Sequence, residues 1–312
     1  MKILVTGAKG FVGKNLVAEL KNRGYEEIYE YDINTEDDQV KVFKVSHSNS
    51  SADEMQLIYE GITYDPCSLY KTTNSDEDGI AITTFKDKLG RVVLERQNGN
   101  DTYYVYDLKG MLCYVLPPLA AKQISTGVHG DDVAVLKKYA YIYKYDERGN
   151  QIYKRLPGCE PILMVYDKSN CLVMNQTGNQ RERGTYWTVY KYDKLKRLIY
   201  TSEVNTKSNN HAELMESFSQ WYVVEQFSTG SLNNPMTNTG YSRGYYHIQP
   251  TELLTVNYYD TYDFLTFVAD ENQSYMSFQA FEGNTTYTTN AKGLLTGTRT
   301  YYLDGSGNYS ET

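Results

Sequence analysis

The sequence predicts a mainly β protein in which a repetitive antiparallel sheet follows a short β-α-β unit. The first observation is a Tyr-Asp turn pattern that recurs along most of the 312 residues. The second is the composition, since 32 Tyr stand against 9 Phe and 2 Trp, and tyrosine favours half-buried pleated surfaces. The third is a glycine-rich turn between an apolar strand and a helical pattern near the N-terminus.

The repeat is clearest around Asp146. Tyr141, Tyr143 and Tyr145 alternate with other residues, so they share one face of a strand. Asp146 to Gly149 has the composition of a turn, because Asp bonds its own backbone and Gly accepts positive φ. A second strand is expected to open near Ile152.

Five further segments carry the same pattern, and the repeat aspartates lie about twenty residues apart or at larger intervals. The six aspartates are Asp87, Asp107, Asp146, Asp167, Asp193 and Asp260. Each unit amounts to two strands and two turns, which cannot close a core alone, so copies must stack side by side. We expect the aspartates to start turns, and Arg91, Arg148 and Arg197 to be solvated or paired along the sheet.

Residues 205–255 interrupt the repeats and are interpreted as an insertion, with a short helix near His211 to Phe218. The pattern Tyr-Asp-x-x-Gly-Arg-Leu resembles the RHS/YD-repeat family, in its Bacteroides-type form, over about residues 54–312. That resemblance implies a repetitive antiparallel sheet wound into an open spiral or shell. In complete members the shell encloses a C-terminal toxin or other cargo domain. Several copies depart from the pattern, including Ser169-Asn170 and Leu195-Lys196.

The first 38 residues form a different unit. Lys2 to Thr6 predicts a strand, residues 12–20 predict a helix, and Glu27 to Tyr31 predicts a second strand that ends at Asp32. Three glycines occupy the first turn and Asp32 stands where a carboxylate accepts from a ribose hydroxyl. The candidate cofactor-binding residues are Gly7, Gly10, Gly13 and Asp32.

This stretch resembles the extended short-chain dehydrogenase/reductase family, in particular the UDP-sugar epimerases and reductases of capsule synthesis. The resemblance implies NAD or NADP as cofactor, but only if further βα units complete the fold. After Asp32 the βα alternation stops. Tyr190 and Lys194 match the Tyr-x-x-x-Lys spacing of that family, yet they lie within a repeat, so we expect Tyr190 to pack and Lys194 to be solvated.

Charge and composition exclude several classes. A formal net charge of −8 argues against a nucleic-acid partner. The four cysteines are far apart and the histidines have no metal-ligand spacing, so neither a disulfide scaffold nor a metal site is expected; Cys113 and Cys159 are interpreted as small buried residues. No apolar run is long enough to span a membrane, and no signal peptide precedes the first strand. The chain as written is expected in the cytoplasm, whereas complete RHS proteins are secreted or lie at the cell surface.

The sequence therefore predicts a chimeric or truncated chain with a partial Rossmann unit at 1–38 and a repeat region at 39–312. The expected function is structural, without catalysis, as a segment of a shell around a toxin or cargo domain. Open strand edges predict self-association. One alternative is an NAD(P)-dependent nucleotide-sugar epimerase or reductase that uses the glycine motif. Another is a cell-surface carbohydrate-binding or adhesion module that uses the tyrosine face.

Overall fold

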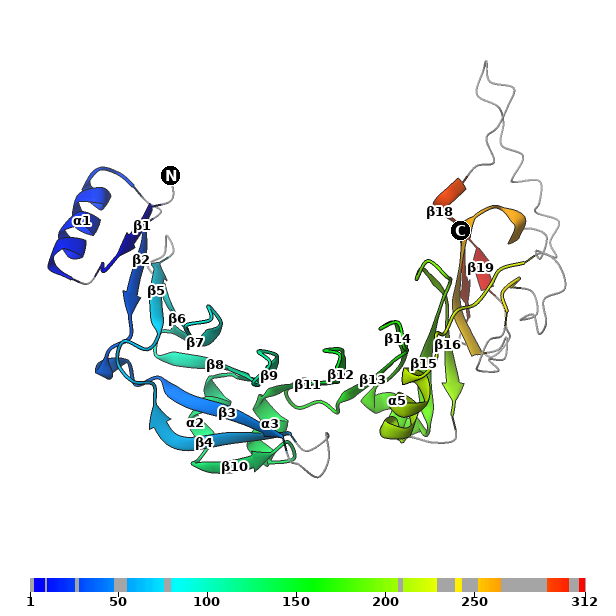
Figure 1. Ribbon diagram of the computed structural model, residues 1–312, viewed down its shortest axis with the longest axis horizontal. Helices are drawn as coiled ribbons and strands as arrows, with labels where there is room; N and C mark the ends of the chain where they lie inside the picture. Colours follow the sequence, from blue (N-terminus) through cyan, green and yellow to red (C-terminus); the bar gives the residue numbers. More distant parts are fainter. Residues whose placement is uncertain are drawn as a thin grey trace, which may run out of the picture. The chain divides into compact units, whose positions relative to one another are not determined.

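The structure is a computed structural model that describes residues 3–8, 10–25, 28–47, 55–75, 80–206, 210–228, 239–242, 252–264, 291–302 and 309–311. The chain divides into two compact units, Met1–Pro161 and Ile162–Thr312. Figure 1 labels most of the elements of both units. The mainly β, antiparallel fold with an N-terminal β-α-β unit is confirmed.

The first unit contains a sheet that runs largely in sequence order. Its strands are β1 (Ile3–Thr6), β2 (Ile28–Ile33), β5 (Tyr70–Ser75), β6 (Ala81–Lys86), β7 (Val92–Gln97), β8 (Asn100–Tyr106), β9 (Leu112–Leu116), β11 (Tyr141–Tyr145) and β12 (Gln151–Arg155). β1 and β2 are parallel, and from β2 to β9 each described neighbouring pair is antiparallel. Consecutive strands pair because tight turns connect them.

Helix α1 (Phe11–Asn22) packs on β1 and β2, so the predicted β-α-β unit is present (Figure 1). Val5, Ala8 and Val17 form its small core. The unit is not separated from the repeats by a linker. β2 pairs on its other side with β5, from Glu30 opposite Thr73 to Ile33 opposite Tyr70.

A second sheet covers one face of the repeat strands. It consists of β3 (Lys41–His47), β4 (Met55–Thr63) and β10 (Gly127–Gly130), in the order β10-β4-β3. A short 3-10 helix, η1 (Glu36–Asp38), precedes β3, and helices α2 (Pro118–Gln123) and α3 (Ala134–Tyr139) complete the cover. We call the face that these elements bury the covered face. The sequence showed no clear pattern over residues 40–51, so strand β3 was not predicted.

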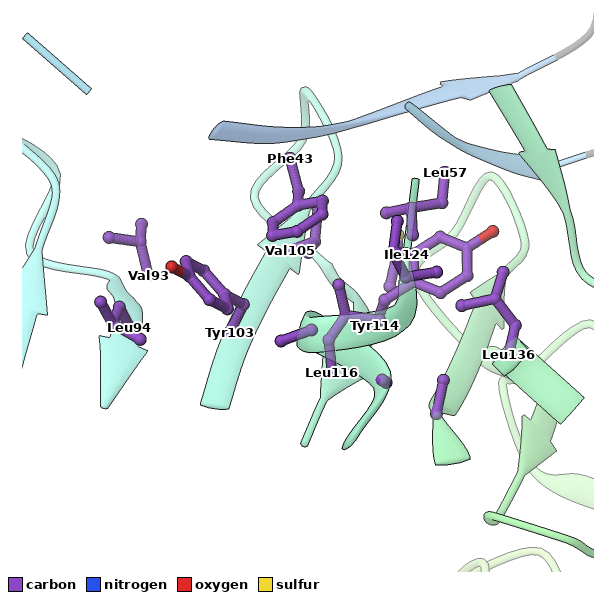
Figure 2. Packing of buried hydrophobic residues seen from close by; sticks show 14 of the residues in the cluster. Phe43, Leu57, Val93, Leu94, Tyr103, Val105, Tyr114, Leu116, Ile124 and Leu136 are labelled. Carbon is purple, nitrogen blue, oxygen red and sulfur yellow. The ribbon is translucent and has the colours of Figure 1, made fainter. Parts of the chain in front are cut away.

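The core of the first unit lies between the covered face and these elements. Figure 2 shows Phe43 and Leu57 of the second sheet above Tyr103 and Tyr114 of the repeat strands. The rings of Phe43 and Tyr103 meet edge to face, with centroids 5.0 Å apart. Leu57 and Tyr114 are fully buried, so the cover excludes water from the sheet.

The second unit also has a repeat sheet with one buried face, which we likewise call its covered face. Its strands, in sheet order, are β13 (Ile162–Tyr166), β14 (Leu172–Gln176), β15 (Tyr186–Tyr192), β16 (Leu198–Asn205), β17 (Leu253–Asp260), β18 (Ala291–Tyr301) and β19 (Tyr309–Glu311). Helix α4 (Gly178–Arg183) connects β14 to β15, and α5 (His211–Ser219) covers the sheet. Trp187 and Val189 pack there with Leu214 and Phe218 of α5.

The predicted helix near His211 is α5, and it begins at that residue. β16 and β17 are adjacent in the sheet, with Ser202 opposite Leu253, although the predicted insertion lies between them in the sequence. Part of that stretch lies outside the described residues. Among the helices that the structure describes, none combines the length and apolar character needed to cross a membrane.

Candidate functional site

The three candidate glycines meet at the carboxyl end of β1, where Gly7 and Gly10 form a tight turn and Gly13 lies in the first turn of α1. Gly7 has φ +67°, which favours glycine. The Gly10 amide donates to the Gly7 carbonyl at 3.0 Å, and Gly10 then precedes the first residue of α1. A Cβ on Gly13 would lie 2.1 Å from the Gly7 carbonyl oxygen, so helix and turn approach as closely as only glycine allows. This close packing of glycines is what a phosphate-binding loop before a helix requires.

Asp32 lies at the same end of the parallel pair. Thr6, the last residue of β1, lies opposite Tyr31 of β2. Asp32 is the next residue of β2, so it lies just beyond the end of β1. Its Oδ1 accepts from the amide of Ile33 at 2.9 Å, and the side chain is partly exposed. The structure therefore brings all four candidate residues to one edge of the β-α-β unit.

The residues around this edge do not complete a dinucleotide site. Such a site needs a crevice between β1 and a parallel strand on its far side. Within the described ranges β1 pairs with β2 alone, and the next neighbour of β2 is the antiparallel β5. The glycine turn that would contact one phosphate is present, but the described residues do not form the wall of the crevice on the far side of β1. A nicotinamide dinucleotide does not fit this edge as it stands.

The Tyr190 and Lys194 pair lies where the repeat places it. Tyr190 is on β15 and half-buried, and burial raises the pKa of its hydroxyl. Lys194 is exposed in the following turn. The two side chains do not share a helix face, as the sequence predicted.

The repeat aspartates bind the backbone of their own turns. In five copies Oδ1 accepts from an amide four residues later; in four of these it also accepts from the amide two residues later. The donors to Oδ1 are Leu89 and Arg91, Met111, Arg148 and Asn150, Ser169 and Cys171, and Leu195 and Arg197. The prediction that these aspartates start turns is confirmed for Asp87, Asp107, Asp146, Asp167 and Asp193.

The fourth residue of each of these turns has a left-handed backbone. Gly90, Gly110 and Gly149 have φ of +81°, +83° and +83°. Asn170 and Lys196 take the same position with φ +61° and +62°. The copies that lack glycine therefore keep the backbone and change only the side chain. All five are three-residue hairpin loops followed by a bulge.

The sixth copy is different. Asp260 itself has φ +72°, and its carboxylate accepts from Arg197 of the preceding copy and from the amide of Gly293. Residues 265–290, which follow it, lie outside the described part of the chain.

Asp87 follows Lys86, and the hydroxyl of Tyr166, before Asp167, contacts Sδ of Met164. In the other four copies the tyrosine before the repeat aspartate connects two copies. Its hydroxyl donates to the carbonyl of the residue that opens the return strand of the preceding copy, always five residues after that copy's aspartate. The four bonds are Tyr106 to Val92 at 3.0 Å, Tyr145 to Leu112 at 3.0 Å, Tyr192 to Leu172 at 2.8 Å and Tyr259 to Leu198 at 3.0 Å. Tyr259 thus obeys the repeat rule although Asp260 does not.

The arginines of the pattern join the same network. Arg91 pairs with Asp87 at 2.7 Å and lies over the ring of Tyr106, 5.0 Å from its centroid. Arg197 pairs with Asp193 at 2.6 Å and lies 4.4 Å from the centroid of Tyr259. Each of these arginines therefore holds its own turn and the tyrosine of the next copy.

Two lysines that pair with carboxylates were not singled out from the sequence. Lys144 and Lys191 each stand between two tyrosines, two residues before a repeat aspartate, and each pairs with a carboxylate on the covered face. The sequence feature that could have revealed them is a lysine at a repeat position where the other copies have an apolar or aromatic residue. The expectation for the cysteines was half right: Cys113 is buried, as expected, whereas Cys159 is exposed.

Comparisons with known proteins support the N-terminal part of this description. The NAD dependent epimerase/dehydratase family matches residues 3–56. No curated protein gives a significant match.

Three solved structures have distant similarity to the chain. It resembles a chain of the TcdB2-TccC3-Cdc42 crystal structure (TM-score 0.33, 12% identity, 83% of this chain and 13% of that one). It also resembles a chain of TcdB2-TccC3 without the hypervariable C-terminal region (TM-score 0.33, 13% identity, 83% and 14%). The third is a chain of the Photorhabdus luminescens Tc holotoxin pore (TM-score 0.33, 12% identity, 83% and 12%). The chain therefore spans only a small part of the proteins that it resembles.

Proposed function

We propose that this chain is a structural repeat segment, a piece of β-sheet wall with no catalysis of its own. The observation that carries the proposal is the recurrent bond from a repeat tyrosine to the preceding copy. A bond repeated at one position in four places serves the stacking of copies, whereas a catalytic group is needed once.

The groups that chemistry would use are already engaged. The repeat aspartates accept from turn amides, the tyrosine hydroxyls donate to carbonyls, and Arg197 is held by both Asp193 and Asp260. Burial raises the pKa of Tyr145 and of Tyr192 to about 12, so both remain protonated donors at neutral pH. Such groups have no free proton acceptor to offer a substrate.

The partner that fits this role is an enclosed toxin or cargo domain in the complete protein. This part of the proposal comes from the resemblance to the RHS/YD-repeat family. The regular hairpins of both units support it, because stacked hairpins can extend a wall by adding copies.

A second candidate is a nucleotide-sugar epimerase or reductase activity that uses a nicotinamide cofactor. It is favoured by the glycine turn and by the family match to residues 3–56. Against it stands the edge position of β1 among the described residues, which leaves the cofactor crevice without its second wall.

Titration of the full chain with NADH and NADPH, followed by nicotinamide fluorescence and calorimetry, tests the choice. The structural proposal expects no saturable binding at up to about 1 mM, since affinity requires most of the ligand surface to be buried. Saturable micromolar binding that is lost in Gly10→Val would overturn it. A Cβ at Gly10 meets only the Gly7 carbonyl, at 3.3 Å, so this variant is expected to fold.

A further inference from the structure

Two lysines occupy one and the same repeat position on the covered face. Lys144 precedes Asp146 by two residues, and Lys191 precedes Asp193 by two residues. In the other copies this position holds an apolar or aromatic residue that is at most 3% exposed. Those residues are Phe85, Val105, Val165 and Tyr258. A lysine thus stands twice where the other copies bury a core residue. Burying its charge is unfavourable unless an oppositely charged group pairs with it.

In each unit the partner is a carboxylate from a segment that crosses the covered face. Lys144 Nζ lies 2.7 Å from Asp131 Oδ2, with side chains 14% and 15% exposed. Lys191 Nζ lies 3.1 Å from Glu225 Oε1, and both side chains are 1% exposed. We call residues 127–133 the first covering segment and residues 221–228 the second.

The surroundings of the two pairs also correspond. Lys144 is opposite Tyr153 and Lys191 is opposite Tyr200, and each tyrosine comes seven residues after its repeat aspartate. The remaining carboxylate oxygen accepts from a hydroxyl in both places. Asp131 Oδ1 accepts from Tyr114 at 2.8 Å, and Glu225 Oε2 accepts from the hydroxyl of Ser242. The two sites are therefore copies of one constellation.

Backbone contacts extend the docking of the second covering segment. The Glu225 amide donates to the Tyr192 carbonyl at 2.9 Å, and Val224 forms a parallel bridge with Tyr192. The Val223 amide donates to Asp167 Oδ2 at 3.1 Å. Val223 and Glu225 point inward, while the residue between them is exposed, so the segment lies extended along two successive copies.

We propose that the repeat lysines are docking sites for covering segments of the chain that carry a carboxylate. A copy of the form Tyr-Lys-Tyr-Asp thereby marks where such a segment covers the sheet. The inference rests on the proposed structural function, since it names the kind of partner that the covered face of the wall accepts. The lysine supplies the positive charge, and the strand and turn supply backbone hydrogen-bond partners. The carboxylate determines which segment docks at that lysine.

Hydrogen exchange of the full chain, read by mass spectrometry, tests this with Lys191→Met and Glu225→Gln. Both variants keep the volume of the side chain and remove the pairing. We expect residues 221–226 to exchange at least about tenfold faster, while β15 and β16 change by less than about twofold. Val189→Ala is the matched control, because it lies on the same strand and face but is uncharged; it should accelerate strand and segment together.

The exchanged pair, Lys191→Glu with Glu225→Lys, should restore slow exchange in residues 221–226. Lys144→Met should accelerate residues 127–131 and leave 221–226 unchanged. The proposal fails if Lys191→Met and Glu225→Gln both leave the segment protected. It also fails if they accelerate β15 and β16 as much as the segment, because the lysine would then only stabilise the sheet. Cofactor binding would overturn the structural function without altering this result, since the glycine turn and Lys191 lie in different units.

Discussion

The hydroxyl of Tyr192 donates to the backbone carbonyl of Leu172 at 2.8 Å, which ties the fifth repeat to the fourth. The tyrosine belongs to the strand that enters one turn, and the carbonyl to the strand that leaves the turn before it. A side chain therefore adds a bond between copies that the backbone ladder does not provide.

Removing this hydroxyl should destabilise the fold. Tyr192→Phe leaves the ring in place and orphans a half-buried carbonyl, so we expect the free energy of unfolding to fall by about 1 kcal/mol. Urea denaturation followed by circular dichroism measures the change. Tyr143→Phe is the control, because the described residues offer its hydroxyl no partner, and it should change stability by less than about 0.5 kcal/mol. Equal effects of the two changes would contradict the role of the bond.

The left-handed turn position should be sensitive to a side chain even where space is free. A Cβ at Gly90 would meet nothing within 4 Å, yet φ is +81°. Gly90→Ala is expected to lower the free energy of unfolding by about 0.5–1 kcal/mol. The left-handed backbone strains an alanine in the folded state, and this cost is only partly offset because alanine also reduces the conformational entropy of the unfolded chain. Thermal and urea unfolding check this, with the exposed neighbour Lys88→Ala as the neutral control. The converse change, Lys196→Gly, should change stability by less than about 0.5 kcal/mol, since it relieves the left-handed backbone but removes the exposed bond from Lys196 Nζ to the Ser169 carbonyl.

The carboxyl of Asp260 should titrate unusually low. Its hydrogen bonds from Arg197, and then from the Gly293 amide, lower its pKa from 3.8 to about 2. Because the folded pKa lies below the unfolded one, the pairing stabilises the fold above pH 3.8 and this contribution is lost as the pH falls towards 2.

Carbon-13 NMR titration of the side-chain carboxyl measures this pKa directly. Arg197→Met should return it towards 3.8, whereas Arg148→Met, in the other unit, should leave it unchanged. An Asp260 pKa near 3.8 in the unaltered protein would disprove the ion pair.

The cysteines should fall into reactive and inert classes. Cys113 is buried, and burial with the nearby Asp107 charge raises the pKa of its thiol to about 12. Cys67 and Cys159 are exposed. Native protein treated with iodoacetamide at pH 8 should therefore carry label at Cys67 and Cys159 while Cys113 reacts only after unfolding. Peptide mass spectrometry identifies the labelled sites, and rapid native labelling of Cys113 would contradict its burial.

The sequence predicted what depends on neighbours along the chain. Turn chemistry, alternation and the glycine turn are local, and the structure has the hairpins at Asp87 to Asp193 and the helix at Phe11–Asn22. What it did not predict depends on contacts between distant segments. β3 has a single buried residue, Phe43, and becomes a strand by pairing with β4. Glu225 pairs with Lys191, 34 positions away in the sequence, and no sequence periodicity indicates that contact.

Strand β2 pairs with β1 in parallel and with β5 in antiparallel register. An unpaired outer strand presents a row of backbone donors and acceptors on which another chain can polymerise. Without residues 1–33, that row would belong to the six-residue β5. With them, the outermost strand among the described residues is β1, which has four residues and packs against a helix. The β-α-β unit therefore leaves a shorter row of backbone groups open at this rim of the described sheet than β5 would.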